Sequence, residues 1–159
     1  MRRFDTSITL TSLRRESGCQ RLSYIGRDHL FNYGGPERDN GVTTMVFNPL
    51  SYSFFQQPTI SLARALLGKL LVKETELGTV SGWIVETEAY IGPEDRAAHG
   101  FGNRRTKRTE VMFGPPGYVY TYVMHTHCPI NVVSGEIGCP EAVLIRAVNI
   151  DQGFCRAPE

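Results

Sequence analysis

Short apolar segments separated by polar connections limit the folds open to this chain. Strand-like segments are predicted at 69–73, 79–90, 118–124, 130–133 and 142–148. The connections between them carry no crossover helix, so neighbouring strands are expected to pair mostly antiparallel. The first two segments are joined by a turn-like sequence and are predicted to form a hairpin. We therefore predict an α+β fold, with a mostly antiparallel β-sheet and short helices.

Two short helices are predicted beside these strands. Thr59 precedes the pattern ISLARALLG and is a typical N-cap, and Gly68 follows the helix where a left-handed conformation is common. A second helix is predicted within RTKRTEVMF, with Thr106 as its cap. The sequence GPPG at 114–117 then indicates a tight turn before the next strand.

The composition indicates one globular domain rather than a fibrous or membrane protein. The chain has 159 residues, of which 41% are hydrophobic and 21% charged. No run approaches the ~18 apolar residues of a membrane span, and the basic start lacks the apolar core of a signal peptide. The four cysteines show no CxxC spacing and favour reduced thiols. These features predict a cytoplasmic protein without a membrane partner.

Residues 1–45 differ from the rest of the chain. They contain scattered glycine and arginine but no sustained hydrophobic period. We therefore expect a disordered or non-native N-terminal extension there, followed by a single domain over 46–150.

Positive charge is concentrated in the run RRTKR, although the formal net charge is only +1. Arg104, Arg105, Lys107 and Arg108 offer contacts to phosphate groups. A solvated turn explains the same run, and the residues alone leave both interpretations open.

The run IVETEAYIGPEDRAAH carries the side chains best suited to chemistry. Strand geometry places Glu86, Glu88 and Tyr90 on one face. A carboxylate there is able to activate water as a general base beside a planar substrate, but a solvated strand face is an equally good explanation. Periodicity does not distinguish the two glutamates, because they share that face.

Aromatic residues on nearby segments are candidate walls of such a pocket. Tyr90, His99 and Tyr122 offer stacking surfaces, and stacking on a base contributes ~1–3 kcal/mol. The alternation in YVYTYVM places Tyr118, Tyr120 and Tyr122 on one face, which a packed sheet also explains. A loop histidine bonded to backbone is the corresponding structural explanation of His99.

Arg146 interrupts the otherwise apolar segment AVLIRAV. An arginine buried in a strand needs an anionic partner. Glu88 or a DNA phosphate would serve, and a purely structural ion pair is the alternative.

A zinc site is a further alternative near residue 125. His125 and His127 point the same way on a strand, and Cys128 and Cys139 offer thiolates. No second clean ligand pair appears, so we expect no metal.

Five segments together resemble the alkyladenine (3-methyladenine) DNA glycosylase family in its bacterial form: LARALLGKLLV, IVETEAYIGPEDRAAH, NRRTKRTEVMFGPPG, YVYTYVMH and AVLIRAV. The resemblance covers about residues 50–149. It implies one compact domain around a curved, largely antiparallel sheet. It also implies a monofunctional, cofactor-free hydrolase that flips alkylated or deaminated purines out of double-stranded DNA and excises them in base excision repair.

The resemblance assigns roles to two polar residues of the strands. Glu88 matches the general base that activates the attacking water, which leaves Glu86 a supporting role. Arg146 matches the arginine that helps to hold the water and a nearby phosphate.

The resemblance also assigns the base pocket. Tyr90, His99 and Tyr122 match the residues that sandwich and contact the flipped base. Asn131 matches an asparagine that disfavours the amino group of guanine, and Leu144 matches an apolar pocket residue.

The chain departs from the family pattern at two places. His125 stands where the family often has a tyrosine that wedges into the minor groove, which makes it a DNA-binding candidate. After about Asn149 the pattern is lost, so residues 46–150 are expected to be the N-terminal two-thirds of the family domain and 151–159 a divergent tail. A truncated, inactive remnant with at most weak DNA binding is therefore the alternative function, and a small zinc-binding module the second. We expect a monomer associated with the nucleoid.

Overall fold

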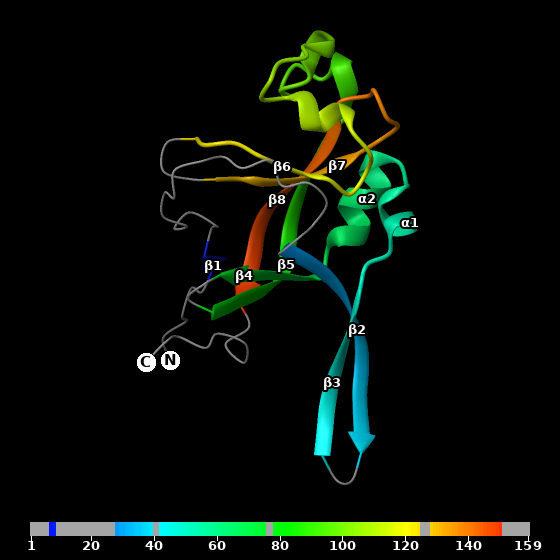
Figure 1. Ribbon diagram of the computed structural model, residues 1–159, viewed down its shortest axis with the longest axis vertical. Helices are drawn as coiled ribbons and strands as arrows, with labels where there is room; N and C mark the ends of the chain where they lie inside the picture. Colours follow the sequence, from blue (N-terminus) through cyan, green and yellow to red (C-terminus); the bar gives the residue numbers. More distant parts are fainter. Residues whose placement is uncertain (1–6, 9–27, 40–41, 76–77, 125–127, 151–159) are drawn as a thin grey trace.

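An antiparallel β-sheet forms the centre of the molecule (Figure 1). The computed structural model describes residues 7–8, 28–39, 42–75, 78–124 and 128–150. Within these residues the sheet has eight strands in the order β3-β2-β4-β5-β8-β7-β6, and β1 pairs with β8 outside this path. Every strand pairing is antiparallel. The predicted α+β class is confirmed.

The strands are β1 (Ser7–Ile8), β2 (Asp28–Asp39), β3 (Val42–Pro49), β4 (Leu70–Thr75), β5 (Gly78–Tyr90), β6 (Val119–Thr121), β7 (Ile130–Ser134) and β8 (Glu141–Ile150). The helices are α1 (Tyr52–Phe55), α2 (Thr59–Leu66) and the 3₁₀ turns η1 (Gly92–Glu94), η2 (Phe101–Asn103) and η3 (Glu110–Phe113). All five predicted strands are present, although β6 is shorter than expected. None of the helices in the described part of the chain is long and apolar enough to cross a membrane.

Helix α2 covers one face of the sheet. Its buried leucines, Leu62 and Leu66, pack in one cluster with Val132, Val143 and Ile145 of β7 and β8. On β5, the Thr87 hydroxyl donates to the Ala63 carbonyl of α2 at 2.8 Å, which places Thr87 on this covered face. The neighbouring strand residues therefore point to the other face.

Thr59 does not cap α2, contrary to the prediction. Pro58 is the N-cap residue and makes no side-chain cap bond. The Thr59 side chain is buried, and its hydroxyl bonds to Ser134 at 2.9 Å and to the Glu141 carboxylate. Thr59 thus ties the start of α2 to β7 and β8. At the other end, Gly68 has the left-handed conformation that was predicted, with φ of 74°.

The segment from η1 to η3 covers one end of the opposite face (Figure 1). Met112 and Phe113 of η3 pack there against Tyr120, Val133 and Ala142 of three neighbouring strands. The chain around η3 forms only a turn and a four-residue 3₁₀ helix rather than the predicted α-helix. This packing places the residues between η1 and η3 above the same face as Glu88.

A long hairpin of β2 and β3 extends from the other end of the sheet (Figure 1). Only the first residues of β2 pair with β4, and the rest pair with β3 alone. Leu30 of β2 is buried in the α2 cluster. The aromatic ring of Tyr33 lies 5.9 Å from Phe47 and 6.4 Å from Trp83. No element was predicted here, because GGP interrupts any period of two. The domain boundary at residue 45 stays a prediction.

Candidate active site

Three candidate residues and Tyr120 lie in one row across the sheet. Glu88 of β5 is paired with Leu144 of β8, Leu144 with Asn131 of β7, and Asn131 with Tyr120 of β6. Residues paired directly across antiparallel strands point to the same face. The row therefore lies on the face opposite α2, and adjacent side chains in it are close enough to contact a common ligand.

Glu88 holds a different partner on each carboxylate oxygen. Its Oε1 lies 3.3 Å from the Nε of Arg146, and its Oε2 accepts a 2.8 Å hydrogen bond from the Tyr90 hydroxyl. The Oε1 of Glu86 lies 3.9 Å from the same Nε. The two glutamates thus lie near Arg146, and Tyr90 joins them through its bond to Glu88.

Arg146 is exposed, which corrects the expectation of a buried arginine. Its side chain is 55% accessible, and those of Glu86 and Glu88 are 59% and 38% accessible. Ile145, which precedes Arg146 in β8, packs in the α2 cluster, whereas Arg146 points to the opposite face. The ion pair is therefore accessible to a ligand that approaches this face.

The Tyr90 hydroxyl keeps its proton over the whole neutral range. Burial, followed by the hydrogen bond to Glu88 and its negative charge, raises the pKa of Tyr90 to about 12. A protonated hydroxyl beside a carboxylate donates its hydrogen bond and orients that carboxylate. Tyr90 therefore fixes one oxygen of Glu88 while Arg146 attracts the other.

His99 joins the loop to two aromatic residues, one in β6 and one directly after it. Its Nδ1 lies 2.7 Å from the Tyr120 hydroxyl, and its ring lies 4.4 Å from the ring of Tyr122. Burial and the positive charge of Arg108 lower the pKa of His99. The imidazole is thus held neutral against two tyrosines. Sequence reasoning treated Tyr120 as a packed residue, and only its place between Tyr118 and Tyr122 signalled its role.

Asn131 is buried and held by the edge strand. Its Nδ2 donates to the Tyr120 carbonyl at 3.1 Å. Leu144, beside it in the row, is also buried. These two side chains form a fixed, mostly apolar floor between the carboxylate and the aromatic group.

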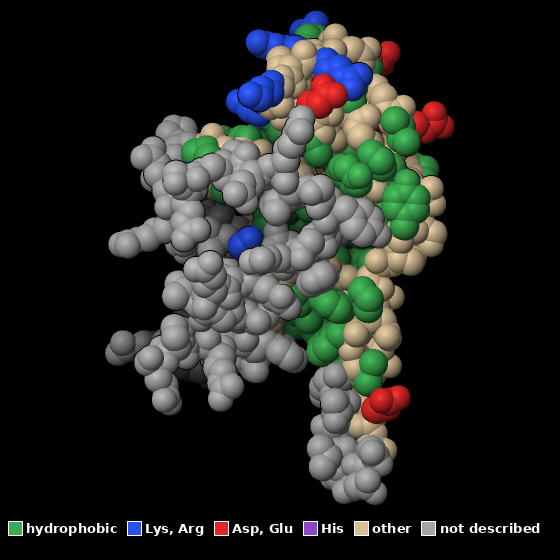
Figure 2. Space-filling model, viewed as in Figure 1, with side chains coloured by type: hydrophobic (Ala, Val, Ile, Leu, Met, Phe, Trp, Pro, Cys, Tyr) green, Lys and Arg blue, Asp and Glu red, His purple; other side chains and the backbone are tan. Residues whose placement is uncertain are grey.

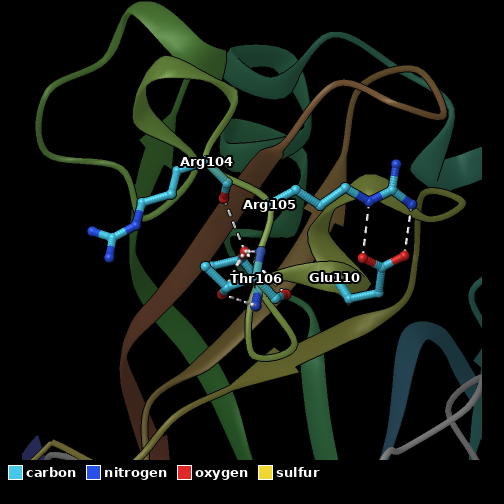
Figure 3. A network of polar contacts seen from close by, with 5 residues as sticks. Arg104, Arg105, Thr106 and Glu110 are labelled. Atoms are coloured by element: carbon cyan, nitrogen blue, oxygen red, sulfur yellow. Dashed lines mark hydrogen bonds and ion pairs between the residues drawn. The ribbon is translucent and has the colours of Figure 1, made fainter.

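The basic run lies at the loop end of the same face, where Lys and Arg side chains gather (Figure 2). Arg105 makes a bidentate ion pair with Glu110, at 2.6 and 2.8 Å, and lies over the Phe113 ring (Figure 3). Arg104, Lys107 and Arg108 are exposed. Arg105 is therefore committed to a local contact that the other three basic residues of the run do not share among the described residues.

Two threonines hold this loop. The amide of Thr109 donates to the Thr106 hydroxyl at 3.2 Å, and the amide of Thr106 donates to the Thr109 hydroxyl at 2.9 Å. The expected cap hydroxyl of Thr106 is thus used, but on a turn. The buried Thr109 hydroxyl also donates to the Arg104 carbonyl at 3.0 Å. The sequence alone did not indicate that Thr109 holds the loop backbone by hydrogen bonds.

Of the four residues of the zinc alternative, the structure describes only the two cysteines. His125, expected to contact DNA, and His127 lie outside the described residues. Cys128 and Cys139 are described and are not joined in a disulfide. In the described ranges, no three His, Cys, Asp or Glu side chains are grouped so that they would hold a metal ion.

Comparison with known proteins points to one family. The model of the family "Methylpurine-DNA glycosylase (MPG)" matches residues 53–158. The matched region includes most of the tail expected to diverge. It also contains all the residues described above as candidates.

Curated bacterial relatives carry the name "Putative 3-methyladenine DNA glycosylase". The relative from Bacillus licheniformis is 67% identical over 106 residues, which are 67% of this chain and 54% of the relative. The relative from Bacillus velezensis is 65% identical over 105 residues, covering 66% of this chain and 54% of the relative. The one from Listeria monocytogenes EGD-e is 52% identical over 104 residues, or 65% and 50% of the two chains. The chain spans about half the length of the curated relatives it matches.

Proposed function

Because the chain belongs to the methylpurine-DNA glycosylase family, we propose that it carries the catalytic centre of a monofunctional DNA glycosylase. The substrate is double-stranded DNA that contains alkylated or deaminated purines, and the reaction is hydrolysis of the bond between the damaged base and its sugar. The observation that carries the proposal is the pair formed by Glu88 and Arg146, at 3.3 Å, on the face that also bears the aromatic residues.

Glu88 is the general base in this proposal. Its carboxylate takes a proton from water as the water attacks the anomeric carbon of the flipped nucleotide. The same negative charge faces the positive charge that develops on the sugar, which stabilises the transition state. The Tyr90 hydroxyl, at 2.8 Å from Oε2, orients the carboxylate. The other oxygen, on the Arg146 side, is the one turned toward water.

Arg146 positions the water and the neighbouring sugar–phosphate. Because its side chain is exposed, the guanidinium is able to contact both Glu88 and an incoming phosphate. Glu86 shares this guanidinium from 3.9 Å and limits how strongly it neutralises Glu88. The support for these roles is the arrangement of the three side chains on an open face.

The flipped purine stacks among Tyr90, His99 and Tyr122. The edge-to-face contact of His99 with Tyr122 and its bond to Tyr120 support a rigid aromatic wall. Asn131 and Leu144 form the floor, where an additional exocyclic amino group of guanine would meet a held amide and an apolar side chain. An alkylated purine is already a good leaving group, so the site needs a flipped base and an oriented water more than a strong acid.

Base release from a damaged duplex tests the proposal. Purified full chain is incubated with duplexes that carry a single hypoxanthine or 3-methyladenine, and free base is measured by chromatography. We expect release by the native chain and its loss in Glu88→Gln, with both proteins folded by circular dichroism. A folded native chain that releases no base would favour the alternative, an inactive remnant that binds DNA weakly.

Trapping with borohydride tests the monofunctional assignment. A glycosylase that attacks with an amine forms a Schiff base with the sugar, which borohydride reduces to a stable cross-link. In the basic run, Lys107 is the one lysine, and it is exposed at the loop. We expect no cross-link to DNA in the presence of borohydride, and a cross-link lost in Lys107→Ala would overturn direct hydrolysis.

A further inference from the structure

The segment between η1 and η3 encloses a cavity beside the candidate active site. The cavity has a volume of about 450 Å³. Its lining residues are Arg96, Ala98, His99, Phe101, Arg104, Thr106, Arg108 and Thr109. This volume lies within the ~300–1,000 Å³ that is common for small-ligand clefts. The cavity is therefore large enough for one charged group and part of what it is attached to.

The lining is basic without a compensating acid. Arg96, Arg104 and Arg108 contribute guanidinium groups, and no Asp or Glu is among the described residues that line the cavity. No ion pair with another described residue engages these three arginines. Three positive charges around one concave space attract an anion, and a guanidinium fits the paired oxygens of a phosphate.

Two neighbouring arginines of the loop, Arg104 and Arg105, make different contacts. Arg104 and Arg105 leave the backbone in opposite directions (Figure 3). Arg105 is bound by Glu110, whereas Arg104 lines the cavity. The buried Thr109 hydroxyl donates to the Arg104 carbonyl and so fixes that backbone. The loop that carries the cations is thus held by its own internal bonds, so its shape does not depend on a bound anion.

The opposite wall of the loop is fixed by Asp95. Its carboxylate accepts hydrogen bonds from the amides of Ala97 at 2.9 Å and Ile91 at 3.3 Å. These bonds fix the turn that carries Arg96. They also engage both carboxylate oxygens of Asp95, the neighbouring acid. Arg96 therefore remains a cation of the cavity rather than a partner of its sequence neighbour.

We propose that this cavity is an oxyanion site that binds one backbone phosphate of DNA next to the flipped nucleotide, held by Arg96, Arg104 and Arg108. The assignment to DNA rests on the proposed function, whereas the assignment to an oxyanion rests on the cavity alone. His99 lines the cavity and also contacts Tyr120 and Tyr122. One side chain therefore joins the phosphate site to the aromatic wall.

Nuclear magnetic resonance of His99 reports occupancy directly. Chain with labelled histidine is titrated with inorganic phosphate, and the His99 signal is assigned with His99→Gln. We expect a saturable shift in the native chain. Arg108→Ala is expected to weaken phosphate binding about tenfold, because one charge-assisted contact is lost. Arg64→Ala is the matched control: it removes one exposed arginine of α2, on the other face of the sheet, that does not line the cavity, and its affinity should equal that of the native chain.

Competition separates DNA from free phosphate as the ligand. An undamaged duplex is expected to displace inorganic phosphate from the native chain. Equal weakening in Arg108→Ala and Arg64→Ala, or no His99 shift, would overturn the oxyanion site. A phosphate shift that the duplex leaves unchanged would overturn its assignment to the DNA backbone. Absence of base release together with a normal shift would instead reject the proposed function and retain the oxyanion site.

Discussion

The two halves of the candidate site are held in different ways. Glu88, Asn131 and Leu144 lie on paired strands, so the hydrogen-bond ladder determines which of their side chains share a face. The basic cavity lies on a loop, where hydrogen bonds of Thr109 and Asp95 set the backbone. The sheet half holds groups for chemistry, and the loop half holds charges for binding. A change in one half should therefore affect a different measured quantity from a change in the other.

Apart from changes to the general base Glu88, replacement of Arg146 should have the largest effect on base release. Replacing it with alanine leaves Glu86 and Glu88 without their shared cation and removes the group that positions water. We expect single-turnover base release to fall by about 10²-fold, a size typical of lost positioning in an active site. Arg146→Lys is the matched control, because it retains the charge without the planar fork.

If Arg146→Ala loses DNA affinity while single-turnover release stays unchanged, the assignment of Arg146 to the chemical step is wrong. Arg146 would then belong with the binding half rather than with the chemical half.

Thr109 should be the largest stability determinant of the loop half. Thr109→Val keeps the shape but removes a buried hydroxyl that bonds to Arg104 and Thr106. Because these partners lose their bond, we expect unfolding to become easier by ~1–3 kcal/mol. Urea denaturation measures this loss, and phosphate binding should weaken with it. Thr106→Val, at a half-buried site of the same loop, is the matched control and should lower the free energy of unfolding by less.

The hydrogen bond between Tyr120 and His99 should have a smaller effect. Tyr120→Phe keeps the buried ring but removes the hydroxyl, 2.7 Å from Nδ1 of His99. We expect about a fivefold loss of base release, equivalent to about 1 kcal/mol. Tyr118→Phe is the matched control, because Tyr118 packs against the same cluster two residues before Tyr120. Equal losses in both variants would show that the His99 contact has no separate role.

The raised pKa of Tyr90 predicts that the stability of the fold depends on pH at alkaline pH. Its pKa in the folded chain is about 12, above the ordinary value of 10.0. Below pH 10 the hydroxyl is protonated in both states, and its contribution to stability is fully present. Between about pH 10 and 12 the unfolded chain loses this proton first, so stability falls with rising pH. Urea denaturation across this range should show a steeper decline in the native chain than in Tyr90→Phe, and parallel declines would contradict the raised pKa.

Strand pairing is what the sequence predicts well. Alternation places Glu88 and Tyr90 on one face, where Tyr90 bonds to Glu88 and Glu88 pairs with Arg146 of the neighbouring strand. Glu86 also lies near Arg146, but the register of β5 and β8 shifts on both sides of Glu86, an irregularity that alternation does not predict. Identifying the base required the family resemblance, since alternation treats both glutamates alike. Short-range patterns therefore predict which strands carry the site but not which glutamate is the base.

Contacts between distant segments are what the sequence does not predict. Thr59 looks like a helix cap but bonds to Ser134 and Glu141, because tertiary contacts supply its hydroxyl with partners. Arg146 looks buried within AVLIRAV but points to the open face of the sheet. The cavity depends on hydrogen bonds of Thr109 that no repeating pattern signals.

The central claim is that Glu88, and not its neighbour on the same face, is the catalytic base. Single-turnover release of hypoxanthine should be compared in Glu88→Gln and Glu86→Gln, which change the same group two residues apart. We predict a loss of at least about 10²-fold in Glu88→Gln, the size expected for a general base, and no more than about tenfold in Glu86→Gln. Equal rates in the two variants, or the larger loss in Glu86→Gln, would contradict it.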